Sequence, residues 1–159
     1  MQRGSTIFLR LAVVTIGLGV FALCTLLLPS VWHVGNEYPD YAFAVYVVLG
    51  TLYVTTVPYF LGLFRAWRVL DMIDAGKAFT LPAVNALGFV SRCAAAISLL
   101  YALSLPFFYL WADGDDAPGL VVIGMVLTGV PLVLSVCLAV LRRLLHEAIV
   151  LKSENDLTV

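Results

Sequence analysis

The chain has 159 residues, of which 62% are hydrophobic and 12% are charged, with a net charge of −1 and a mean hydropathy of +1.03. Soluble domains are about half apolar and about a quarter charged, so this composition excludes an ordinary soluble domain. The Lys and Arg residues are few and scattered along the chain. This argues against direct nucleic-acid binding, which relies on a clustered basic surface.

Four apolar stretches are long enough to cross a membrane. A spanning helix needs about 20 apolar residues, each rising about 1.5 Å, to cross about 30 Å of hydrocarbon. The stretches that meet this requirement are residues 11–29, 41–64, 93–111 and 118–141. Because little sequence remains for a soluble domain, we predict an all-α transmembrane four-helix bundle that forms a single membrane domain over residues 1–159.

The first stretch has some features of a signal peptide, since Arg3 and Arg10 precede it. It is longer than an ordinary signal core, and no cleavage site of the small-x-small type follows it. We therefore interpret it as a retained helix. We expect this span to end at Pro29 and to be followed by a short outer loop over residues 33–40, which have turn composition.

The second stretch contains Pro58, which we expect to kink its helix. The helical pattern continues beyond the membrane over residues 65–75 and is expected to end at Gly76, since glycine often follows the last helical residue. Residues 80–82, Thr-Leu-Pro, are typical of a helix start. We expect the turns over residues 81–92 to precede the third span on the same side of the membrane.

The fourth stretch leaves the membrane at Arg142 and keeps a helical pattern. Apolar residues recur there at three- and four-residue spacing, with polar residues between them. We therefore expect a helical extension over residues 142–152, followed by a polar tail over residues 153–159.

Charged residues are sorted between the two sides of this arrangement. All nine Lys and Arg residues fall on one side, at Arg3, Arg10, Arg65, Arg68, Lys77, Arg92, Arg142, Arg143 and Lys152. The two loops on the other side carry acids alone, at Glu37, Asp40, Asp113, Asp115 and Asp116. Because cytoplasmic loops retain Lys and Arg during insertion, we expect a protein of the cell membrane with both termini in the cytoplasm.

The apolar stretches contain no Asp, Glu, Lys, Arg or His. Ionisable residues usually mark ion and proton pathways through lipid, so their absence argues against a proton-coupled transporter. The two histidines, His33 and His146, are expected on opposite sides of the membrane, and neither lies in a recognisable nucleophile motif. We therefore predict a protein that is not an enzyme and that uses no cofactor.

Three aspartates in one outer loop are weak candidates for a cation site. Asp113, Asp115 and Asp116 provide carboxylates that could bind Ca²⁺ or Mg²⁺, with Glu37 and Asp40 on the same side. Their spacing is not that of an EF-hand loop, and the glutamate that would end such a loop is missing. We favour a solvated turn and predict no metal site.

Hydroxyl groups and small residues leave two alternative functions open. A transporter or channel with a hydroxyl-lined path around Tyr46, Tyr53 and Tyr101 is one, although such groups more often hydrogen-bond between helices. The other is an oligomeric structural membrane protein. Small residues that recur on one face of the third helix are typical of close contacts, within one bundle or in a homo-oligomer, at Ser91, Ala95, Ser98 and Ala102.

Three segments carry a resemblance to a known family: residues 71–79, residues 106–119 and the ending over residues 148–159. The chain resembles the bacterial domain-of-unknown-function family 2975, the YoaS-like membrane proteins, over nearly its whole length. The resemblance implies a small four-span membrane protein with no assigned activity and no catalytic residues. Family members are often encoded beside a small helix-turn-helix regulator, which implies such a regulator as a cytoplasmic partner.

The cytoplasmic face is the working surface that we predict. Helical extensions of about ten residues would reach about 15 Å beyond the bilayer. We predict a signalling or regulatory role in which this face binds the regulator, and the alternative is that the extensions merely close the bundle. The expected partner-binding residues are Trp67, Leu70, Ile73, Leu144, Leu145 and Leu151, with Glu154, Asn155 and Asp156 in the tail.

Overall fold

The structure, a computed structural model, describes residues 3–37, 42–76 and 80–157. These residues form four helices, α1 (Arg3–Glu37), α2 (Ala42–Asp74), α3 (Leu81–Gly114) and α4 (Gly119–Leu157), and the described ranges include no strand. The predicted all-α architecture of four helices is confirmed.

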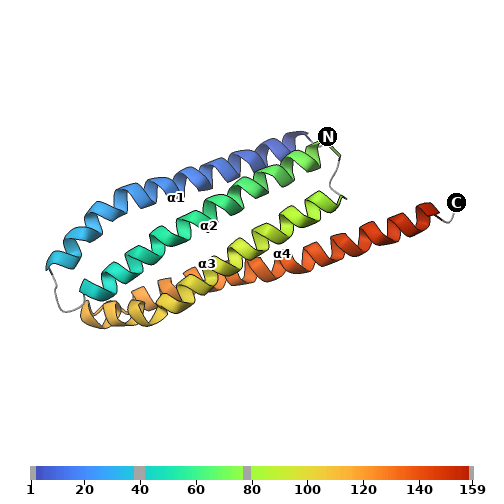
Figure 1. Ribbon diagram of the computed structural model, residues 1–159. Coiled ribbons are helices and arrows are strands. Elements are labelled where there is room, and N and C mark those ends of the chain that lie inside the picture. The colour runs from blue at the N-terminus through green and yellow to red at the C-terminus, as the bar shows by residue number, and fades with distance from the viewer. Residues whose placement is uncertain (1–2, 38–41, 77–79, 158–159) are drawn as a thin grey trace.

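Three of the helices are long and apolar enough to cross a membrane, over Ala42–Asp74, Leu81–Gly114 and Gly119–Glu154. Among the described residues, the apolar part of α1 is Arg10–Leu26, which is shorter than the 18 residues taken as the least length for a span. Successive helices run in opposite directions, so both chain ends lie at the same end of the molecule (Figure 1).

The helices lie in a row in the order of the chain. Among the described residues, α1 packs on α2, α2 on α3 and α3 on α4, and no other pair of helices is in contact. The contacts of α3 with α2 and α4 are extensive, whereas α1 makes fewer contacts with α2. The bundle is therefore open, with α1 and α4 at its two edges (Figure 1), and only 6% of the most apolar window of α4 is buried.

Two helices continue further than the sequence indicated. The expected loop over residues 33–40 is wrong in its first part, because α1 continues to Glu37. A proline removes one backbone donor, and the remaining peptide groups still need partners inside the helix. The helical extension expected over residues 142–152 is longer than predicted, since α4 continues to Leu157 through most of the polar tail. Residues 142–157 contain neither Gly nor Pro to end the helix. Residues 38–40 and 158–159 of the predicted loop and tail lie outside the described ranges.

The helix boundaries between α2 and α3 agree with the sequence. α2 continues through Pro58 and ends at Asp74. Gly76 follows with a φ of 70°, a left-handed conformation that favours glycine, and its N–H donates to the carbonyl of Ile73 at 3.0 Å. α3 begins after Thr80, with Pro82 in its first turn.

Hydroxyl groups join the helices at their contacts. The hydroxyl of Ser91 in α3 donates to the carbonyl of Ser135 in α4 at 2.9 Å, and the hydroxyl of Ser135 donates to the carbonyl of Ser91 at the same distance. The hydroxyl of Ser98, also in α3, likewise donates to a carbonyl of α4, that of Thr128 at 2.8 Å. Ala95 and Ala102, expected on the same contact face, are exposed.

The apolar core lies nearer the end of the molecule opposite the chain termini. Its buried residues come from α2 and α3 and are Val48, Tyr101 and Phe108. Partly buried residues of α3 and α4 pack around them, namely Ile97, Phe107, Trp111 and Leu127. Gly124 of α4 is buried against the ring of Phe108, which lets the two helices approach closely.

Candidate functional site

The end of the molecule that carries the chain termini also carries its described arginines, and we call it the basic end. At this end α1 is attached to α2 through Arg10. Nη2 of Arg10 lies 2.6 Å from Oδ1 of Asp71 and 2.8 Å from Oδ2 of Asp74. Its guanidinium also lies over the ring of Trp67, 5.4 Å from the centroid. Charge pairing and cation–π attraction therefore hold the two helices together here.

The partner-binding residues predicted on α2 are partly used by this contact. Leu70 is 7% exposed, Trp67 is half-buried with Arg10 over its ring, and Ile73 is exposed. Since α2 and α4 make no contact among the described residues, these side chains do not form one surface with the residues predicted on α4. The single cytoplasmic surface expected from the sequence is therefore divided into two.

The part of that surface on α4 is open. Leu144 is 57% exposed and Leu151 is 66% exposed, while Leu145 is half-buried. Figure 1 shows this end of α4 continuing alone beyond the first turn of α3. Glu154 is exposed, and Asn155 and Asp156 belong to the last turns of the helix, with their side chains outside the described part of the structure.

The three tyrosines proposed to line a path are not buried together. The hydroxyl of Tyr101 is buried and lies 3.2 Å from Oγ1 of Thr55, a contact between α3 and α2. Tyr53 is 48% exposed on the outside of α2, and Tyr46 is half-buried. The hydroxyls of Thr51 and Thr56 donate to carbonyls of their own helix. These groups hydrogen-bond within and between the helices, as membrane helices commonly require.

The three aspartates of the predicted outer loop lie where α3 ends: Asp113 belongs to the last turn of α3, and Asp115 and Asp116 form the turn that follows. Asp113, Asp115 and Asp116 are all exposed, and Asp116 has a φ of 49°, in a region that aspartate tolerates better than most residues. Within the described residues, no three His, Cys, Asp or Glu side chains are grouped so that they would hold a metal ion. Asp40 lies outside the described residues, as does the side chain of Glu37.

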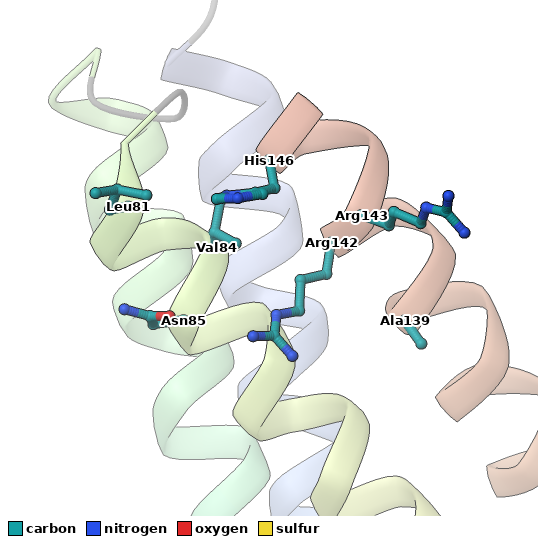
Figure 2. Close-up of a pocket in the computed structure, with 7 residues that line it drawn as sticks. All are labelled: Leu81, Val84, Asn85, Ala139, Arg142, Arg143 and His146. Carbon is teal, nitrogen blue, oxygen red and sulfur yellow. The ribbon is translucent and has the colours of Figure 1, made fainter. Parts of the chain in front are cut away.

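A pocket at the basic end was not anticipated from the sequence. It has a volume of about 280 Å³ and lies between the first turns of α3 and the late part of α4 (Figure 2). Its lining is Leu81, Val84 and Asn85 of α3 with Ala139, Arg142, Arg143 and His146 of α4. The four-residue spacing of Arg142 and His146 places both on one face of a helix, a signal that the sequence contained. The opposite wall of the pocket belongs to α3, about 60 residues earlier in the chain, and the spacing of Arg142 and His146 does not predict that α3 lies there.

Comparison with known proteins gives a family and one curated relative. Residues 29–159 match the family described as protein of unknown function (DUF2975). The whole chain is 48% identical over 160 residues to the uncharacterized membrane protein YoaS of Bacillus subtilis (strain 168), and the alignment covers 100% of both proteins. No solved structure matches the chain.

Proposed function

Since the chain belongs to the DUF2975 family of membrane proteins, to which no activity is assigned, we propose its function from its own surfaces. The protein is a non-enzymatic regulatory protein of the cell membrane that binds a cytoplasmic protein through the free end of α4. The partner that we propose is a small helix-turn-helix regulator, the class implied by the family resemblance. Binding would hold this regulator at the membrane and away from DNA until a signal releases it.

The exposure of Leu151 is the observation that carries this proposal. Leu151 follows Arg142 by nine residues, a distance of about 13 Å along a helix, so it lies outside the hydrocarbon if α4 continues straight out of the membrane. It is nevertheless 66% exposed. Leu144 precedes it by seven residues and therefore lies on the same face of the helix. An apolar stripe of this kind is what a protein groove recognises when it binds a helix.

Co-purification tests the proposal. The double variant Leu144→Ser/Leu151→Ser should lower the affinity for the regulator at least tenfold, because burying each leucine contributes about 1.5–3 kcal/mol and every 1.4 kcal/mol changes the affinity tenfold. Val150→Ser is the matched control. Val150 is also exposed but lies on another face of α4, so this variant should bind as the original protein does.

The last turn of α4 is tested separately with a chain that ends at Lys152. If this truncation leaves binding unchanged, Glu154, Asn155 and Asp156 have no part in it, and the leucine face is sufficient. If the full-length protein and the regulator do not associate at all, or if Val150→Ser weakens binding as much as the double variant, the proposed binding face is wrong.

The proposal requires the basic end to face the cytoplasm, as the distribution of Lys and Arg predicts. In a variant whose three native cysteines have been replaced, a Gly114→Cys substitution should react in intact cells with a membrane-impermeant thiol reagent. A Ser153→Cys substitution should react only after the cells are permeabilised. The opposite pattern of labelling would place the termini outside the cell and remove the basis for a cytoplasmic partner.

A further inference from the structure

The pocket between α3 and α4 combines positive charge with an apolar wall. Arg142 and His146 extend from α4 toward α3, and Leu81, Val84 and Ala139 provide apolar surface (Figure 2). Among the described residues, no Asp or Glu lines the pocket, and the first turn of α3 carries no acid. No described carboxylate in the lining therefore opposes the binding of an anion here.

Arg142 has no charged partner among the described residues. No hydrogen bond or ion pair within the described part of the chain involves its guanidinium. The side chain instead lies on the backbone of Gly88. A Cβ atom at Gly88 would stand 2.8 Å from Nε of Arg142 and 2.9 Å from its Cδ and Cζ. Glycine at this position thus makes room for the arginine beside the pocket.

The neighbouring arginine is placed differently. Nε of Arg143 donates to Oε1 of Glu147 at 3.0 Å, and Figure 2 shows the guanidinium of Arg143 turned away from α3. Successive helical residues are rotated by about 100°, so two adjacent arginines cannot both extend toward α3. The charge of Arg143 is already paired, whereas that of Arg142 is available to a ligand.

We propose that this pocket binds a phosphate group, with Arg142 as its principal ligand. The planar guanidinium presents a fork of N–H donors that matches two phosphate oxygens. The volume of about 280 Å³ fits a headgroup and is smaller than most pockets for drug-sized molecules. Arg142 directly follows the last apolar stretch of the sequence, which places the pocket at the depth of lipid headgroups.

Two sources of phosphate fit this chemistry, an anionic lipid and the free anion. The test uses the full-length protein in neutral maltoside micelles and measures its melting temperature against increasing ligand, from which an apparent Kd follows. The probes are dioleoyl phosphatidylglycerol, inorganic phosphate, and dioleoylglycerol as the lipid without a phosphate. Stabilisation by phosphatidylglycerol alone identifies a lipid site, and stabilisation by inorganic phosphate as well identifies a site that also accepts the free anion.

Arg142→Gln and Arg68→Gln are the matched pair, since each removes one arginine charge from the basic end, and the exposed Arg68 of α2 does not line the pocket. Arg142→Gln should raise the apparent Kd for the effective probe at least tenfold, and Arg68→Gln should change it by no more than about twofold. Gly88→Ala is a second variant, in which the new methyl group displaces the Arg142 side chain, and it should weaken binding several-fold while the helix itself gains stability. It keeps the test usable if Arg142→Gln does not fold.

Three results would overturn the assignment. An equal loss in Arg142→Gln and Arg68→Gln would mean that diffuse charge, and not this pocket, attracts the anion. Unchanged binding in both Arg142→Gln and Gly88→Ala would mean that the ligand lies elsewhere. A melting temperature that rises equally with dioleoylglycerol, or with none of the probes, would mean that no phosphate is recognised. This inference does not depend on the proposed regulator, since the assay contains no partner protein.

Discussion

Replacing Gly124 with leucine should lower the free energy of unfolding by about 2 kcal/mol. A Cβ atom at this position would lie 3.0 Å from Cγ of Phe108 and 3.2 Å from Cδ2 of Leu105, and the rest of a leucine side chain would have to displace both. Overpacking of this kind costs about 1–3 kcal/mol. Unfolding of the purified protein by SDS in mixed micelles, followed by circular dichroism, measures the change.

Gly129→Leu is the control for this substitution. Gly129 belongs to the same helix, and a Cβ atom there would meet no atom within 4 Å. Replacing a helical glycine removes a helix-propensity cost of about 0.8–1 kcal/mol, so the control should be neutral or slightly stabilising. Equal destabilisation by the two substitutions would mean that α3 and α4 do not pack as described.

The second large effect is expected at the paired serines of α3 and α4. Ser91→Ala and Ser135→Ala should each lower the free energy of unfolding by about 0.6 kcal/mol and by no more than about 1.7 kcal/mol, the average and the maximum measured for hydrogen bonds between membrane helices. The double variant should lose about 1–3 kcal/mol, because each substitution removes one of the two reciprocal bonds. The same SDS titration measures all three variants and shows whether the two bonds are coupled.

Ser153→Ala is the matched control, since the hydroxyl of Ser153 donates to a carbonyl of its own helix, that of Val150 at 2.7 Å, and is exposed. It should leave the stability unchanged. A double variant at Ser91 and Ser135 that is as stable as the original protein would show that these hydroxyls do not join the helices.

The positions of the helices could be predicted from the sequence, whereas the faces through which they pack could not. Both results have one physical reason. Length and apolarity identify a membrane helix, and Gly76 and Thr80 marked the boundaries between α2 and α3. In lipid, however, the outer and inner faces of a helix are both apolar, so the sequence pattern does not indicate which face packs. Ser91 and Ala95 are both small, and the structure shows that Ser91 is buried against α4 whereas Ala95 is exposed.

The candidate site was predictable to the same limited extent. The apolar pattern of the helical extensions, which we predict to be cytoplasmic, identified Leu144 and Leu151, and both are exposed. The same reasoning selected Leu70, which the structure buries. The ion pairs of Arg10 with Asp71 and Asp74 join residues more than 60 positions apart, and no local pattern indicates such a contact. For the same reason, the pocket around Arg142 required the placement of α3 beside α4.

The row of helices also has a consequence for how the protein assembles. Each helix packs only on its neighbours in the chain among the described residues, so no contact has to wait for two distant helices to meet. Contacts of this kind form fast, because little loop-closure entropy opposes them. The protein can therefore assemble one hairpin at a time as it leaves the ribosome, each new helix docking on the one inserted just before it, with no final step in which the first helix must find the last.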